Sequence, residues 1–142
     1  MPINMSVEIL QPVVVLVGWS MVMWIWMYVT RLPAVQAAGM QLDSSRPRGE
    51  QMATLPPRVR WKADNYNHLM EQPTIFYPLV IVIALLGQGE GLNLYMAWAY
   101  VILRIVHSLF QALNNTIMVR FVLHVLSSIP LFVMIWSAFM AF

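Results

Sequence analysis

Four stretches of the chain are long apolar runs with few charges, and each has the length of a membrane-spanning helix. A span needs about 20 apolar residues, because a helix rises about 1.5 Å per residue and the hydrocarbon core is about 30 Å thick. The predicted spans cover residues 8–30, 65–87, 92–113 and 117–141. The pattern therefore predicts an all-α membrane protein, in which residues 1–142 form one domain, a bundle of four transmembrane helices.

The predicted connections differ greatly in length. Residues 31–63 form a long first loop that is rich in Pro, Gly, Ser and charged residues and shows no hydrophobic period. The segments 87–91 and 114–116 are short turns, so the last three spans must be antiparallel neighbours. Pro73 and Pro78 predict a bend near the start of the second span.

Composition and charge fit this interpretation. Of the 142 residues 60% are hydrophobic and 10% are charged, whereas a soluble domain has about 25% charged residues. The absence of Cys excludes disulfides, thiolate metal sites and cysteine nucleophiles. Six of the eight basic residues lie within 31–63, so the positive-inside rule predicts that this loop is cytoplasmic and that both termini lie on the other side. We expect a lipid bilayer as the environment, and no nucleic-acid partner.

Each of the last three spans carries a line of polar residues at helical spacing. Such groups are costly in hydrocarbon, and they persist where they face a bundle interior or a wet cavity. Spacings of three and four place the members of a line on one helix face. The lines are Asn65, His68, Glu71 and Gln72; Arg104, His107, Ser108, Gln111 and Asn115; and Arg120, His124 and Ser127. We therefore expect the three lines to converge.

The depth of these residues can be estimated from the helical rise. His107 and His124 each lie about 12 Å from the turn that joins the third and fourth spans. Glu71 lies at a similar depth, and Arg104 lies somewhat deeper. All of them fall in the half of the bundle nearest the long loop, which predicts a site open to the cytoplasm and not a path across the membrane.

Several of these residues also fit structural roles. Glu71 and Arg104 could form a buried ion pair, and Arg120 could extend to lipid phosphates. His124 and Gln111 could hydrogen-bond between helices. The histidines of the third and fourth spans could also ligate a haem through two imidazoles. No other metal site is expected.

The chain resembles the MAPEG family, the membrane-associated proteins of eicosanoid and glutathione metabolism. The likeness covers nearly the whole chain and includes the four-span topology with its long first loop. Its motifs are Asn65-Tyr66 and Glu71-x-Pro73-x-x-Phe76-Tyr77 in the second span, Arg104-x-x-His107-Ser108 in the third, and Arg120 at the start of the fourth. The second-span motif is similar to that of bacterial members, so we expect a bacterial inner-membrane protein. The resemblance also implies a four-helix bundle that assembles as a homotrimer.

The resemblance implies that glutathione is the co-substrate and binds between subunits near the cytoplasmic side. Glu71 would hold its amino end, Arg31 would meet a carboxylate, and Arg120 would be the cation near the sulfur. The implied glutathione-binding residues are Arg31, His68, Glu71, Arg104, His107 and Gln111, and the implied catalytic residues are Arg120 and His124. A free thiol has a pKa near 8.5, which a nearby Arg lowers. The implied activity is that of a glutathione S-transferase or peroxidase acting on lipophilic electrophiles.

The chain departs from the family pattern at a few positions. Eukaryotic members show Arg-x-x-x-Asn-x-x-Glu in the second span, where this chain has Asp64, His68 and Glu71. A Tyr that often follows the third-span His by four residues is Gln111 here. These differences favour a second hypothesis, a non-catalytic accessory or structural subunit of a larger membrane complex.

Overall fold

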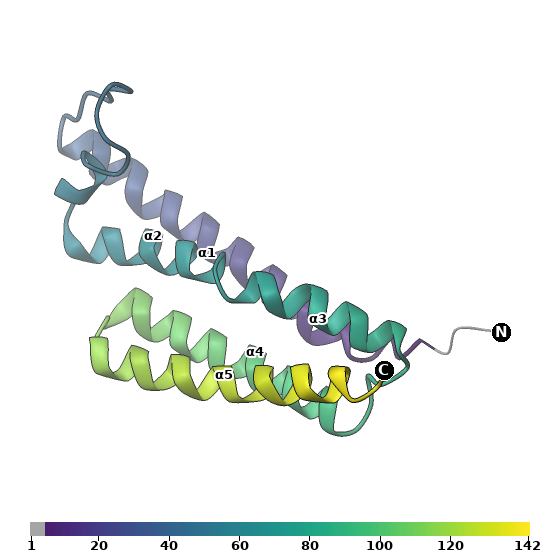
Figure 1. Ribbon diagram of the computed structural model, residues 1–142. Helices are drawn as coiled ribbons and strands as arrows, with labels where there is room; N and C mark the ends of the chain where they lie inside the picture. Colours follow the sequence, from purple (N-terminus) through teal and green to yellow (C-terminus); the bar gives the residue numbers. More distant parts are fainter. Residues whose placement is uncertain (1–4) are drawn as a thin grey trace.

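The computed structural model describes residues 5–142, and within them the regular secondary structure is entirely helical. The helices are α1 (Leu10–Ala37), α2 (Pro57–Leu69), α3 (Pro73–Leu85), α4 (Leu92–Leu113) and α5 (Ile117–Phe139), with a 3-10 turn, η1 (Met52–Thr54). Helices α2 and α3 together form one bent rod (Figure 1). This rod, α1, α4 and α5 are each long and apolar enough to cross a membrane. The protein is therefore an all-α, multi-pass integral membrane protein, as the hydrophobic pattern predicts.

The two ends of the bundle differ in what they contain. Helix α1 runs beside α2 and α3, and α4 and α5 form a hairpin (Figure 1). The connection 38–56 and the α4–α5 turn lie at the same end, which we call the loop end. The start of α1 and the end of α5 lie at the opposite end, the terminal end (Figure 1). The up-and-down order of the helices agrees with the short turns seen in the sequence.

The long connection is shorter than the predicted loop 31–63, which is corrected at both ends. Helix α1 continues past Thr30 through Arg31 and Pro33 to Ala37. Helix α2 begins at Pro57, whose fixed φ and missing N–H suit the first helical position. The prediction ended each span where the apolar run ends, but backbone hydrogen bonding continues into polar sequence. The extra turns of α1 and α2 form the walls of a pocket described below.

The predicted bend in the second span is a full break. Helix α2 ends at Leu69 and α3 begins at Pro73. Proline cannot donate to the carbonyl one turn back, and its ring clashes with that carbonyl inside a helix. The intervening Glu71 is turned outward and exposed, while the neighbouring Gln72 donates to the Ser128 hydroxyl at 2.9 Å. The break therefore directs Glu71 away from the bundle and Gln72 toward α5, although the two residues are adjacent in the sequence.

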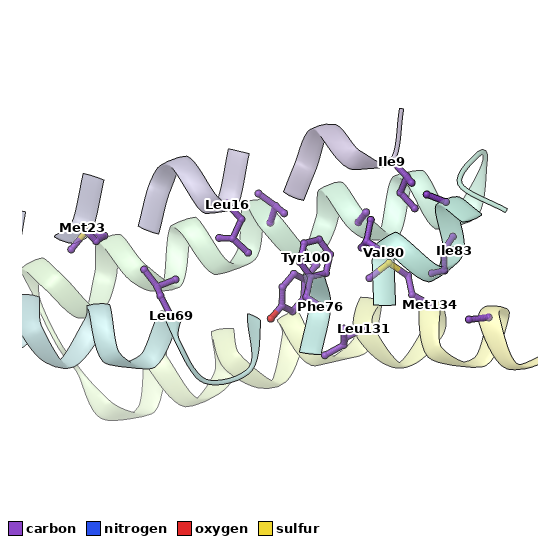
Figure 2. Close-up of a cluster of buried hydrophobic side chains, with 14 of the residues drawn as sticks. Ile9, Leu16, Met23, Leu69, Phe76, Val80, Ile83, Tyr100, Leu131 and Met134 are labelled. Carbon is purple, nitrogen blue, oxygen red and sulfur yellow. The ribbon is translucent and has the colours of Figure 1, made fainter. Parts of the chain in front are cut away.

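The apolar core extends from the terminal end to the middle of the bundle. Helix α1 contributes Ile9, just before its start, and every seventh residue after it, Leu16 and Met23. Phe76 stacks on Tyr100 with ring centroids 4.5 Å apart. Figure 2 shows the cluster formed by Ile9, Leu16, Met23, Leu69, Phe76, Val80, Ile83, Tyr100, Leu131 and Met134. This core fixes the helices and leaves the loop end to the polar residues.

Candidate functional site

Arg104 of α4 is the centre of the polar cluster at the loop end, with 0% of its side chain exposed. Its Nη1 lies 3.1 Å from Nδ1 of His124 and 3.4 Å from Nε2 of His68. Its Nη2 donates to the backbone carbonyl of His68 at 3.2 Å. One guanidinium thus joins α2, α4 and α5.

These contacts determine the proton positions on two imidazoles. A guanidinium only donates hydrogen bonds, so Nδ1 of His124 and Nε2 of His68 must be the unprotonated, accepting nitrogens. The remaining proton of His124 then lies on Nε2. The proton of His68 lies on Nδ1, which is 2.9 Å from Oε2 of Glu71 and donates to it. Arg104 therefore fixes both histidines as neutral donors at their other nitrogen.

Glu71 and Arg104 do not form the direct ion pair considered from the sequence. His68 lies between them, bonded to Glu71 on one side and to Arg104 on the other. The Glu71 side chain is 67% exposed, whereas that of His68 is 19% exposed. The carboxylate therefore lies at the edge of the bundle, and the imidazole of His68 connects it to the buried guanidinium by hydrogen bonds.

The three polar lines converge as predicted. The ring of His68 lies 4.9 Å from that of His107 and 5.2 Å from that of His124, and His107 and His124 are 6.2 Å apart, measured between centroids. In residues 5–142, no group of three or more His, Asp or Glu side chains is arranged to hold a metal ion. The cluster is instead organised around the guanidinium of Arg104.

A pocket of about 200 Å³ opens beside this cluster. Its lining residues are His68, His107, Ile117, Arg120, Phe121 and His124. Ile117, Arg120, Phe121 and His124 follow one another on one side of α5, whereas His68 and His107 come from α2 and α4. The lining thus combines imidazoles and a guanidinium with two apolar side chains that are exposed on the bundle surface. Such a mixed lining suits the reaction of a polar, anionic group with an apolar molecule.

The α4–α5 turn positions Arg120. Asn115 adopts the left-handed conformation, with φ of 60°, which Asn tolerates better than most residues. Its Oδ1 accepts a hydrogen bond of 2.6 Å from Nη1 of Arg120. The Arg120 Nε and the His107 Nδ1 are buried without a hydrogen-bond partner in the described part of the chain. Unsatisfied polar atoms of this kind are rare in folded proteins, and they mark the place where a ligand or water would bond.

A second set of hydrogen bonds supports the cluster from behind. The Ser108 hydroxyl accepts from Trp19 Nε1 and from Asn65 Nδ2, both at 2.8 Å. These bonds join α1, α2 and α4 next to His107. The role of Trp19 was missed in the sequence, where it looked like any residue of an apolar run. Its signal was the indole N–H, which needs a partner when it is buried.

Two predicted site residues lie apart from the pocket. Gln111 is 2% exposed, one turn beyond His107, and does not line the pocket. Arg31 lies between α1 and α2, in a different pocket that also contains Arg60. The structure thus brings together His68, Arg104, His107, Arg120 and His124, with Glu71 at the edge.

Comparison with known families adds to this geometry. The sequence model described as the MAPEG family matches residues 9–140, a range that includes every residue of the pocket. The chain belongs to the MAPEG family. The resemblance seen in the sequence motifs is thereby confirmed, and with it the four-helix membrane architecture. Comparisons with curated proteins and with solved structures give no match.

Proposed function

We propose that this MAPEG protein binds glutathione at the loop end and uses its thiolate in a transferase or peroxidase reaction with lipophilic electrophiles. The observation that carries the proposal is the pocket of about 200 Å³, which Arg120 and His124 line beside the apolar side chains of Ile117 and Phe121. Family membership supports a role in glutathione or eicosanoid metabolism. The activity itself follows from the chemistry of the pocket.

Arg120 and His124 would act directly on the sulfur. A free thiol ionises near pH 8.5, and a nearby cation stabilises the thiolate at neutral pH. Arg120 supplies that cation. Because Nδ1 of His124 accepts from Arg104, its Nε2–H is available as a second donor. In the transfer reaction, the sulfur forms a bond to the electrophilic carbon, and the leaving group departs with its electron pair.

The buried charge of Arg104 favours an anionic ligand. The described part of the chain places no carboxylate in direct contact with this guanidinium. A buried charge without a partner is costly, especially in a membrane-spanning helix. Glutathione carries two carboxylates and one ammonium group, so it would bring a net negative charge near Arg104 and His107. Glu71, exposed at the edge, is placed to meet the ammonium end.

The remaining expectations concern assembly and orientation. Arg31 lies between α1 and α2, so it would join the glutathione site only from a neighbouring copy. This fits a homotrimer with glutathione bound between subunits. The loop end would face the cytoplasm of a bacterial inner membrane, because most of the basic residues lie there. The electrophile would enter from the bilayer past the exposed apolar side chains of Ile117 and Phe121.

Equilibrium dialysis of the purified full chain against radiolabelled glutathione tests the proposal. We expect saturable binding at millimolar concentration or below, and weaker binding by Arg120→Gln. Circular dichroism verifies that each sample is helical. Absence of saturable binding by a helical wild-type protein would contradict the proposed function.

One observation favours the second hypothesis, a non-catalytic subunit of a larger membrane complex. Gln111 is buried and cannot supply a phenol to a thiolate. Mild-detergent purification distinguishes the two hypotheses: co-purification with larger subunits supports the accessory role, and a lone homo-oligomer supports the enzyme.

A further inference from the structure

A second polar pocket lies at the loop end, between α1, α2 and the connection that joins them. Its volume is about 210 Å³. Its lining residues are Arg31 of α1, Gly49, Met52 and Ala53 of the connection, and Arg60, Ala63, Asp64 and Asn67 of α2. This pocket forms because both helices extend past their apolar runs. It shares no lining residue with the pocket beside Arg104, which lies between α2, α4 and α5.

Two guanidinium groups of this pocket are not held by the protein. The Nε atoms of Arg31 and Arg60 are buried, and neither has a hydrogen-bond partner among the described residues. Within residues 5–142, the one contact between an arginine and a carboxylate within ion-pair distance is Arg46 with Asp43, so neither guanidinium pairs with Asp64 across the pocket. Each of the two guanidinium groups therefore has an Nε–H donor that meets no acceptor among the described residues.

Lys62 provides an internal contrast. It lies on the same helix, but its ammonium donates to the backbone carbonyl of Arg58 at 2.8 Å and lies 5.5 Å from the ring centre of Trp26. The chain itself therefore satisfies this cation. Arg31 and Arg60 differ because their partner must come from outside.

We infer that this pocket binds an oxyanion, which Arg31 and Arg60 grip together from α1 and α2. Guanidinium groups match phosphate and carboxylate oxygens in bidentate geometry, and buried unpaired donors gain most from such a partner. The phosphate of a phospholipid headgroup is the source that we expect, because the pocket lies where two apolar helices meet a polar loop. A soluble phosphate or a peptide carboxylate offers the same chemistry. Asp64, on the same wall, opposes the anion and weakens its binding.

Native mass spectrometry of the full chain in detergent tests this inference, with phosphatidylglycerol as the probe and diacylglycerol as the lipid without a phosphate. We expect phosphatidylglycerol to bind and diacylglycerol not to bind. Arg31→Gln and Arg60→Gln should each weaken binding by about tenfold, the effect of losing one charge-assisted hydrogen bond. Asp64→Asn should strengthen it, because the opposing carboxylate is removed.

Arg58→Gln is the matched control. Arg58 is exposed on the same helix, does not line the pocket, and gives the same loss of one positive charge. Competition by inorganic phosphate or glutathione, lost in Arg31→Gln and Arg60→Gln, would also support the oxyanion site and would assign it to a soluble ligand. An equal loss in Arg58→Gln, undiminished binding in both pocket variants, or no binding of any probe by the wild-type protein would overturn the inference. Arg60 and Asp64 lie outside the proposed glutathione site, so Arg60→Gln and Asp64→Asn test this inference independently of that site. Arg31→Gln would also weaken glutathione binding, which is assayed separately by equilibrium dialysis.

Discussion

The two halves of the bundle are held together in different ways. From the middle to the terminal end, the helices meet mainly through apolar packing, for example where Phe76 stacks on Tyr100 (Figure 2). The inter-helix hydrogen bond from Asn93 to Ser137 adds to this packing near the terminal end. At the loop end they meet through hydrogen bonds, which converge on Arg104 and on Ser108. In a bilayer, apolar packing between helices gains little from leaving lipid, while each unsatisfied polar atom is costly. The polar side chains at the loop end are therefore costly for the stability of the bundle. We attribute their presence to ligand binding, as in the proposed function.

The largest expected effect concerns the apolar half. Phe76→Ala should lower the free energy of unfolding by about 3 kcal/mol or more, because it removes a fully buried ring and leaves a cavity. Denaturant unfolding in detergent, followed by circular dichroism, measures this change. Phe132→Ala is the control, because that ring is 71% exposed on α5 and faces outward. Equal destabilisation by both variants would show that the Phe76 cluster is not the core of the bundle.

The next effect concerns the polar half. Arg120→Gln should lower kcat/KM for a lipophilic electrophile by about a hundredfold, the usual cost of removing one group that stabilises developing or bound negative charge. The unfolding midpoint should change little, because the Arg120 contact to Asn115 is local to the turn. Arg58→Gln removes the same charge far from the pocket and should keep full activity. A loss of similar size in Arg58→Gln would indicate a general electrostatic effect.

His124→Phe should reduce kcat/KM by about tenfold, the lower end of the range for removing a positioned donor or proton-transfer group. The ring shape is retained, but the Nε2–H donor and the acceptor for Arg104 are lost. Steady-state kinetics with glutathione as the varied substrate measures this change. If the variant retains wild-type kinetics, then His124 contributes only packing.

The smallest effect concerns the support behind the cluster. Ser108→Ala leaves the Trp19 and Asn65 donors unpaired and should lower the free energy of unfolding by about 1 kcal/mol. Ser127→Ala is the control, because its hydroxyl bonds only to the backbone carbonyl of His124, one turn before it. Detergent unfolding curves compare the two. An effect of Ser127→Ala as large as that of Ser108→Ala would argue against a special role for the inter-helix bonds.

Much of this comparison could be predicted from the sequence. The length of the apolar runs gave the four spans, and the three-to-four spacing of polar residues gave the faces that meet. The convergence of His68, His107 and His124 followed from those faces and is confirmed by the ring distances.

The details of the site required coordinates. The exposure of Glu71 depends on the helix break at Pro73, which a continuous-helix projection cannot represent. The separation of Arg31 from the histidines depends on which flank of α2 borders α1. Trp19 of α1 donates to Ser108 of α4, and no spacing rule along one helix predicts such a contact between helices.

The state of the bound thiol tests the account most directly. The ultraviolet absorbance of the thiolate can be followed in the protein–glutathione complex as the pH is raised, in the wild type and in Arg120→Gln. The account predicts half-ionisation at least about one pH unit below that of free glutathione in the wild type, with most of this shift lost in the variant. Ionisation of bound glutathione at the same pH as the free thiol would contradict the claim that the polar half of the bundle is built to hold a thiolate.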